Sequence, residues 1–218
     1  MEEENEMPST IVTISCQFGS GGRLIGAELS KRLGIPCYEK ALFEEAARHS
    51  GIHQRFFERA EGRSERVYAS TFSCRYTPMD MSLDDRMYIA QTEAIRQLAR
   101  QGACIIVGRG ANHILEGYGE LLNIFVYAEK AVRVKRAVEL YGVPGERAEK
   151  LLDSIDKNRA AYLKFYTEQV FGKAENYHFC IDSGKLGIEN TVRTIEAVFR
   201  MQEQRSSGRM EEGHGKAY

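Results

Sequence analysis

A cluster of glycines directly after a short apolar segment constrains this chain more than any other feature. Residues 11–14 are Ile-Val-Thr-Ile and predict a buried strand, because β-branched residues favour strands. Three glycines follow within residues 19–22, and from Leu24 the apolar residues recur at the spacing of one buried helix face. A strand, a glycine loop and a helix together present backbone N–H groups and a helix N-terminus to a phosphate. The residues expected to bind phosphate are Gly19, Ser20, Gly21, Gly22 and Arg23.

The loop departs from the regular P-loop pattern G-x-x-x-x-G-K-S/T. If Gly21 is the second glycine of that pattern, Cys16 replaces the first glycine and Gly22 replaces the lysine. If Gly22 is the second glycine, Arg23 replaces the lysine and Leu24 replaces the hydroxyl residue. The lysine is missing in both alignments, and Arg23 is the nearest cation that can bind phosphate oxygens. A tight β–α turn that binds nothing is the alternative interpretation.

Composition narrows the classes of function. The formal net charge of −1 leaves no broad basic field, so we expect no nucleic acid and no membrane surface as a partner. There is no apolar run of membrane-spanning length, and the acidic residues 1–7 are not a signal peptide. Five scattered cysteines without a C-x-x-C pair favour a reducing, cytoplasmic setting. The five histidines show no metal-binding spacing, so no metal ligands are predicted with certainty.

Strands and helices alternate along the chain. After the first strand, further apolar segments predict strands at residues 34–38, 103–107, 122–126 and 178–181. Amphipathic patterns predict helices at residues 39–49, 84–101, 111–115, 129–141, 146–166 and 188–201. This alternation predicts an α/β fold of three layers (αβα), with a five-stranded parallel sheet covered by helices on both faces.

The domain organisation follows from the same pattern. Residues 10–201 form a single predicted domain, between a flexible N-terminus at 1–9 and a flexible tail at 202–218. Residues 51–83 lack a clear periodicity, and such long connections are usually lids or partner surfaces. If this segment packs its apolar residues against a second chain, the protein is a homodimer.

Polar residues follow several of the predicted strands, where parallel sheets bind their ligands. Tyr38, Glu39 and Lys40 lie at the end of the second strand, and Arg109 follows the third between two glycines. Arg109 has little structural reason to stand there, which favours a functional role. Asp182 follows the last strand and can alternatively cap the next turn. One edge of the sheet is thus predicted to gather N–H groups, an arginine and two carboxylates.

At this point the chain resembles the P-loop nucleoside monophosphate kinases, and most closely the cytidylate kinase-like proteins. The resemblance covers most of residues 11–200. It rests on the order and spacing of residues 14–23, 34–40, 107–111 and 125–129, of Arg133 and Arg136, and of residues 156–159 and 181–184.

The resemblance implies a P-loop kinase fold with an acceptor-binding segment at about residues 39–83 and a helical lid at about residues 133–166. Gly19 to Arg23 would hold the ATP phosphates, and Arg109 would hold the acceptor phosphate together with the segment that starts at Tyr38, Glu39 and Lys40. The expected catalytic residues are Arg23, Arg109, Arg133, Arg136 and Arg159. Asp156 and Asp182 would help to position these residues without contacting the substrates.

The implied activity is transfer of a phosphoryl group from ATP, with Mg²⁺, to a nucleoside monophosphate, with CMP or dCMP favoured. Such chemistry needs in-line positioning and compensation of charge on the transferred group, which arginines and Mg²⁺ supply. The residues also have plain alternatives. Arg133 and Arg136 lie three apart on a charge-rich helix and can be a solvated face, and Asp156 and Arg159 can be a surface ion pair.

Three other functions stay open from the sequence. The missing lysine allows a nucleotide-binding protein with weakened catalysis, and the same architecture allows a kinase of another small acceptor. A dinucleotide-binding oxidoreductase is the third alternative, because Gly19-x-Gly21 with Glu39 about twenty residues later imitates its fingerprint. Leu24 occupies the place of the third glycine in that fingerprint, which argues against it.

Overall fold

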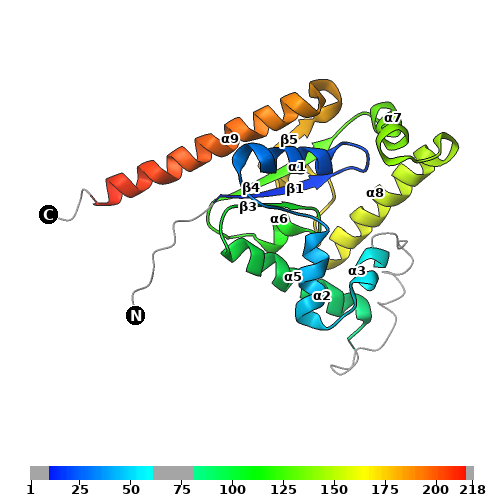
Figure 1. Ribbon diagram of the computed structural model, residues 1–218, viewed down its shortest axis with the longest axis horizontal. Helices are drawn as coiled ribbons and strands as arrows, with labels where there is room; N and C mark the ends of the chain where they lie inside the picture. Colours follow the sequence, from blue (N-terminus) through cyan, green and yellow to red (C-terminus); the bar gives the residue numbers. More distant parts are fainter. Residues whose placement is uncertain (1–9, 61–80, 215–218) are drawn as a thin grey trace.

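A computed structural model describes residues 10–60 and 81–214 of the chain (Figure 1). The predictions for residues 1–9, for most of the segment 51–83 and for the last residues of the tail therefore lie outside the described part. The roles of 51–83 as lid or dimer surface stay predictions. The first part of this segment is described and differs from the prediction: a helix forms at Gln54–Ala60 (α3), where the sequence pattern indicated irregular structure.

The centre of the molecule is a sheet of five parallel strands in the order β2-β3-β1-β4-β5 (Figure 1). This confirms the predicted five-stranded parallel sheet. β1 is central and pairs with β3 and β4, so the residue after it leaves the sheet near the middle of its edge. The strands are β1 (Ile11–Cys16), β2 (Cys37–Tyr38), β3 (Cys104–Val107), β4 (Leu121–Tyr127) and β5 (Phe179–Asp182).

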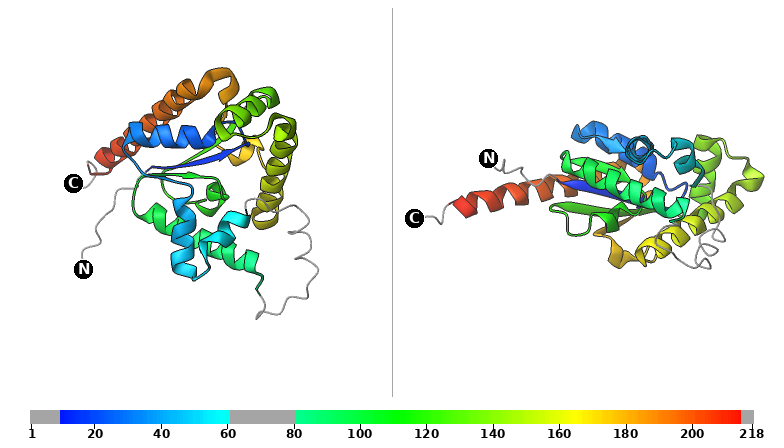
Figure 2. Two further views of the ribbon diagram at one scale, coloured as in Figure 1. Left: turned by 45° about the vertical axis from the view of Figure 1, so that its right-hand side comes forward. Right: turned by 90° about the horizontal axis from the view of Figure 1, so that it is seen from below.

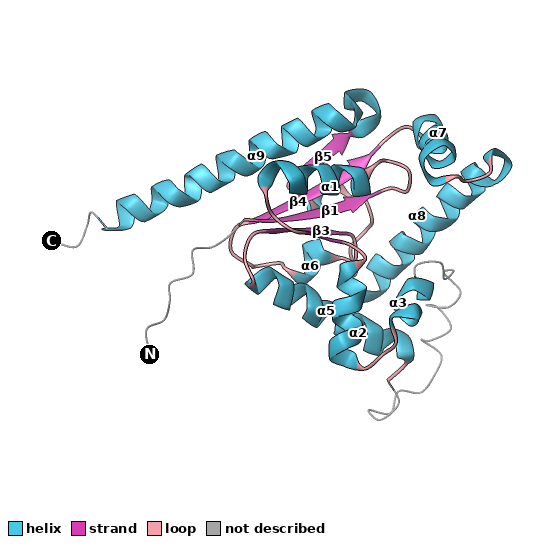
Figure 3. Ribbon diagram, viewed as in Figure 1, coloured by secondary structure: helices cyan, strands magenta, loops and turns pink. Residues whose placement is uncertain are grey.

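Helices connect the strands and cover both faces, which confirms the three-layer αβα fold (Figures 1 and 3). Most of their bounds lie within two residues of the predicted ones. They are α1 (Gly22–Leu33), α2 (Ala41–Ser50), α3, α5 (Leu83–Arg100), α6 (Ala111–Ile114), α7 (Lys130–Tyr141), α8 (Gly145–Thr167), the 3₁₀ turn η1 (Ala174–Asn176) and α9 (Ser183–His214).

Alternation along β1 divides the interior into two cores. Val12 and Ile14 face α1 and α9 and pack with the apolar residues of those helices. Ile11 faces the opposite side and packs with α2, α5 and α6. A slip of one residue in β1 would exchange the two faces, so the strand's register is fixed by burial on both sides.

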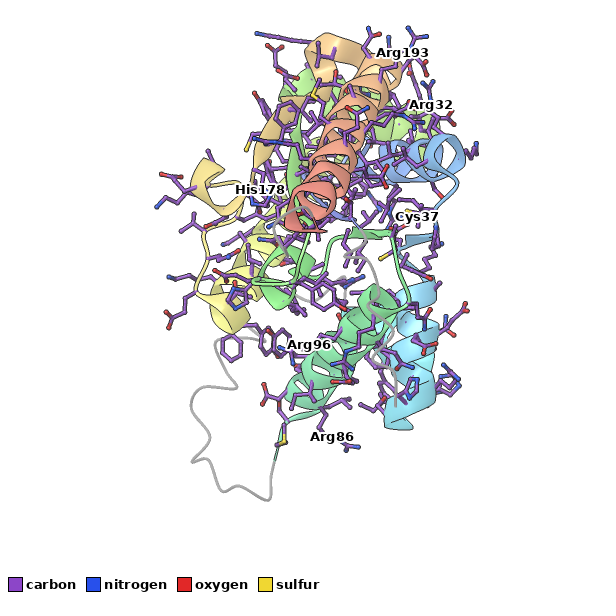
Figure 4. The ribbon with its side chains drawn as sticks, turned by 90° about the vertical axis from the view of Figure 1, so that its left-hand side faces the viewer. Arg32, Cys37, Arg86, Arg96, His178 and Arg193 are labelled. Carbon is purple, nitrogen blue, oxygen red and sulfur yellow. The ribbon has the colours of Figure 1, made fainter. Side chains whose placement is uncertain are left out.

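The last helix differs from the prediction in length. Its regular part begins after Gly187, where φ is 75° and the helix breaks, close to the predicted start at residue 188. It then continues to His214, past the residue 201 where the sequence pattern ended, and its last turns extend beyond the amino ends of the strands (Figure 2). Side chains nearer its start bind α1: Arg32 Nη2 and Arg193 Nε lie 2.5 Å and 3.0 Å from the same carboxylate oxygen of Glu189. Figure 4 labels Arg32 on α1 and Arg193 on α9.

Among the helices that the structure describes, we find none that combines the length and the apolar character needed to cross a bilayer.

Candidate active site

The glycine loop lies between β1 and α1, as the sequence predicts. Gly21 immediately precedes α1 and has a φ of 91°, a conformation that glycine adopts without steric cost. The first N–H groups of an α-helix have no partner within the helix, and those of α1 begin at Gly22. The loop therefore offers an anion the N-terminus of a twelve-residue helix.

Ser20 is part of the loop but its hydroxyl faces inward. The side chain is fully buried, and its Oγ donates to the carbonyls of Gln17 (2.8 Å) and Val126 (3.0 Å). Its backbone N–H also bonds to Gln17 O at 3.2 Å, which closes a turn. In this structure Ser20 holds the loop onto β4.

Three arginines predicted as catalytic bind three alternate carbonyls of this stretch. Arg159 of α8 donates to Cys16 O at 2.8 Å. Arg133 and Arg136 of α7 donate to Phe18 O (3.3 Å) and to Ser20 O (3.0 Å). α7 and α8 lie beyond the carboxyl ends of the strands (Figure 3), in the predicted place of the lid. These guanidinium groups thus hold the loop from the side of α7 and α8.

Asp156 completes the contact between α8 and the loop. Its Oδ1 accepts a hydrogen bond from Phe18 N at 2.7 Å, and its Oδ2 lies 2.5 Å from Nη1 of Arg133. Both side chains are largely buried, at 18% exposure for Asp156 and 8% for Arg133. Asp156 is therefore a buried partner of Arg133 and of the loop backbone, and not the surface partner of Arg159 that the sequence allowed as the plain alternative.

Ser183 is a contact that the sequence analysis did not single out. It is fully buried at the start of α9, and its Oγ donates to Ser20 O at 2.5 Å. Arg136 reaches the same residue, with Nη1 3.0 Å from Ser183 Oγ and Nη2 2.7 Å from Ser183 O. Burial lowers the pKa of the Arg136 guanidinium, and nearby Tyr141 and Asp182 oppose that shift.

Asp182 caps the beginning of α9. Its Oδ1 accepts from Gly184 N at 2.8 Å and from Lys185 N at 3.2 Å. This is the plain alternative that the sequence allowed for Asp182.

Arg23 and Glu39 form an ion pair between the first turn of α1 and the end of β2. Their side chains are 39% and 27% exposed, so the pair is partly open to solvent. The neighbouring predicted residues lie elsewhere. Tyr38 packs against the core under α2, and Lys40 is exposed where α2 begins.

Arg109 occupies an unusual backbone conformation. Its φ is 62°, between Gly108 and Gly110, which are also left-handed. A left-handed non-glycine residue costs free energy that the surroundings must offset. The Arg109 guanidinium lies 4.2 Å above the ring of Phe43, which orients it by a cation–π contact.

These residues meet at a cavity of about 370 Å³ between the carboxyl edge of the sheet, α5 and α8. Its polar end contains Ser15, Arg23, Glu39, Arg109 and Arg159. The rest of the lining comes mainly from α5 and α8 and is largely apolar and aromatic, although it includes the Asp84 carboxylate. The sequence analysis missed several of these residues: Met87, Tyr88, Gln91, Tyr162, Leu163 and Tyr166. Of the predicted acceptor residues, Glu39 and Arg109 line the cavity, whereas Tyr38 and Lys40 do not.

A helical spacing could have indicated the missed residues. Asp84, Tyr88 and Gln91 recur at the spacing of one face of α5, and Arg159, Tyr162 and Tyr166 do so on α8. Each face contains tyrosines, whose polar ends suit the wall of a cavity. Within residues 10–60 and 81–214, no group of three or more His, Cys, Asp or Glu side chains could hold a metal ion.

A central parallel sheet with a glycine loop at its edge, an arginine-rich cavity and two helices beyond the strand ends together define a P-loop kinase fold. Residues 11–185 match the cytidylate kinase-like family. The chain belongs to that family, which confirms the resemblance seen in the sequence. No curated protein matches it.

Two solved structures illustrate the likeness. An uncharacterized protein from Eubacterium ventriosum ATCC 27560 superposes with a TM-score of 0.67 and 26% sequence identity, covering 88% of this chain and 98% of that one. Shikimate kinase from Bacteroides thetaiotaomicron superposes with a TM-score of 0.52 at 15% identity, again over 88% and 98%. The second likeness concerns the fold alone.

Proposed function

We propose that this protein transfers a phosphoryl group from ATP to a nucleoside monophosphate, with CMP and dCMP as the favoured acceptors. The observation that carries the proposal is the cavity, which joins guanidinium groups at one end to aromatic rings at the other. A nucleotide carries an anionic phosphate and a planar base, so its binding site needs both guanidinium groups and aromatic rings within the length of one molecule. Family membership supports the same reaction class.

The ATP phosphates would bind at the N-terminus of α1, where backbone N–H groups and the helix dipole favour anions. The acceptor phosphate would lie at the polar end of the cavity, with Arg109 and Arg159. Phosphoryl transfer needs the two groups in line and their charge compensated. Arg133 and Arg136 would act by positioning, because their donors hold carbonyls of the loop.

Kinase chemistry implies Mg²⁺. Mg²⁺ in such sites is bound by one or two carboxylates together with substrate phosphates, so a large protein ligand set is not needed. Glu39, which is paired with Arg23, supplies a carboxylate to the cavity, and the Ser15 hydroxyl lines the same cavity. These oxygen donors fit an ion that arrives with the nucleotide. When bound, the ion neutralises charge on the phosphates. Glu39 is the residue expected to hold the Mg²⁺ ion. The expected compartment of the protein is the cytoplasm.

Glu39 also favours a second candidate, a kinase whose acceptor is a hydroxyl group. A carboxylate in the cavity can take the proton of an attacking hydroxyl, whereas an acceptor phosphate needs no such base. Glu39→Gln separates the two candidates. Loss of a general base lowers kcat about 10²–10⁴-fold with a nucleoside acceptor. With a monophosphate acceptor, the pH dependence of kcat should keep its shape in the variant.

The experiment that tests the proposal measures ADP release from ATP and Mg²⁺ with CMP, dCMP, UMP, AMP, GMP or no acceptor. We expect turnover with CMP or dCMP, reduced about 10³-fold in Arg109→Ala by analogy with other arginines that contact a transferring phosphoryl group. Arg96→Ala is the matched control, because Arg96 is exposed on α5 and does not line the cavity. ATP binding without acceptor-dependent turnover would contradict the proposal and favour the weakened nucleotide-binding protein.

A further inference from the structure

The aromatic end of the cavity is built by two helices. The rings of Tyr88 (α5) and Tyr166 (α8) are stacked, with centroids 4.1 Å apart and an interplanar angle of 8°. Tyr162 lies one turn before Tyr166 and meets the Tyr88 ring edge-on at 6.2 Å and 65°. The three rings fix one another, so the wall they form is preorganised for a planar ligand.

Gln91 lies one turn after Tyr88 on α5 and lines the same cavity. Its side chain is only 3% exposed, and its Oε1 has no hydrogen-bond partner among the residues that the structure describes. Buried amide oxygens are almost always bonded, because an unmade bond leaves the cost of desolvation uncompensated. A hydrogen-bond acceptor is thus held without a donor beside a ring-lined cavity.

The cavity has the size of small-molecule sites, and the charged residues of its lining are unevenly distributed. Three arginines and Glu39 line the part that we call the polar end, whereas Asp84 is the charged residue that α5 contributes beside Tyr88. Arg23, Arg109 and Arg159 line the polar end, so an anionic group on the ligand would be oriented there. A planar ring on the same ligand would then extend toward the tyrosines and Gln91. The orientation of the ligand follows from this charge difference.

We propose that the tyrosine end binds the base of the acceptor and that Gln91 Oε1 accepts a hydrogen bond from an exocyclic amino group on that base. Gln91 is then the residue that distinguishes cytosine from uracil, because uracil presents a carbonyl oxygen where cytosine presents the amino group. With the amide in the orientation of this structure, uracil offers no donor to Gln91 Oε1, and the unsatisfied acceptor penalises the wrong base. This inference rests on the proposed function for the phosphate end and adds the selection of the base.

The test measures, by calorimetry, the binding of two ligands to the wild-type protein and to a Gln91 variant, so that the change in the protein is compared with the change in the ligand. The two ligands are CMP and the 5′-monophosphate of the pyrimidin-2-one ribonucleoside, which has the same ring without the amino group. We expect the wild-type protein to bind CMP about 10- to 100-fold more tightly than the amino-free analogue. In Gln91→Leu the ratio should fall to near one. Equal ratios in the two proteins would overturn the inference.

Two further variants control for altered folding. Gln91→Glu keeps an acceptor oxygen and the chain length, so it should retain the preference for the amino-bearing ligand. Gln97→Leu makes the same chemical change on α5 at a position outside the cavity and should keep the wild-type ratio. A lost preference in Gln97→Leu would contradict the assignment to Gln91.

The outcomes also separate this inference from the proposed function. Binding that depends on Gln91, without any transfer from ATP, would support the base site and refute the kinase activity. Transfer to CMP with a binding ratio that does not depend on residue 91 would support the kinase activity and refute the base site.

Discussion

A β-carbon on Gly22 would stand 2.5 Å from the sulfur of Cys16 and 2.7 Å from its Cβ. Real side chains do not approach so closely, so the two positions share one space. In the alignment that takes Gly21 as the second glycine of the P-loop pattern, the first glycine falls at Cys16 and the lysine at Gly22. The two departures from the pattern are therefore one structural exchange: a side chain at position 16 requires glycine at position 22.

Restoring the lysine alone should accordingly fail. We expect Gly22→Lys to lower the free energy of unfolding by about 1–3 kcal/mol through overpacking against Cys16, without a gain in activity. Adding Cys16→Gly removes the obstacle, so the double variant should be more stable than the sum of the single changes predicts. Urea denaturation of the four proteins measures this coupling, which we expect to be about 1 kcal/mol or more. Additive changes would mean that the two residues do not compete for space.

Asp156 should matter more for stability than its place on a charged helix indicates. Asp156→Ala leaves Arg133 buried without its carboxylate, and breaking such a pair costs about 3–5 kcal/mol. The control is Asp153→Ala, which removes an exposed partner of Lys130 and should change stability by less than about 1 kcal/mol. Chemical denaturation measures both. Similar losses for the two variants would contradict the buried role of Asp156.

Arg159→Lys should separate positioning from charge. The lysine keeps the positive charge but cannot reproduce the guanidinium bond to Cys16 O, so the loop shifts relative to the acceptor. We expect kcat to fall about 10²-fold, the effect of small misplacements in oriented reactions, while the melting temperature changes little. Lys157→Arg, at an exposed neighbouring position, serves as the control. An unchanged kcat in Arg159→Lys would show that charge alone is enough at this position.

Stability should decline in alkaline solution above the ordinary thiol pKa of 9.0. Burial raises the pKa of the Cys104 thiol to about 12 and that of Cys37 to about 11, from an ordinary value of 9.0. The unfolded chain therefore loses these protons first, so their contribution to stability is complete below pH 9 and is lost as the pH rises toward 11–12. Urea midpoints at pH 8, 9.5 and 10.5 should fall more steeply for the wild type than for Cys104→Ala. Parallel declines would contradict the assignment.

The periodic parts of the fold could be predicted from the sequence, because each strand and helix carries its own burial pattern. β1, the glycine loop and α1 lie where the pattern placed them. Side-chain contacts between residues far apart in the sequence leave no comparable pattern in it. The partner of Arg133 is 23 positions away, and the pattern around it resembles a solvated helix face. The bond from Ser183 to Ser20 spans 163 positions and likewise depends on how the elements pack.

The cavity illustrates the same limit. Arg109 and Glu39 could be predicted because they directly follow strands, whose ends meet at one edge of a parallel sheet. Gln91 and the tyrosines lie within helices, where a polar residue among apolar ones does not show which neighbour it faces. The resemblance assigned Tyr38, Glu39 and Lys40 together to acceptor binding, but Tyr38 packs against the core at the end of β2 and Lys40 is exposed where α2 begins.

The position of α8 has a consequence for how the protein would respond to its ligands. One helix contacts the glycine loop through Arg159 and the aromatic wall through Tyr162 and Tyr166, one and two turns further along. Any tilt of α8 therefore changes both sites at once. We expect the affinities of the two ligands to be reciprocally linked: whatever factor one ligand applies to the affinity of the other, the second applies the same factor to the first.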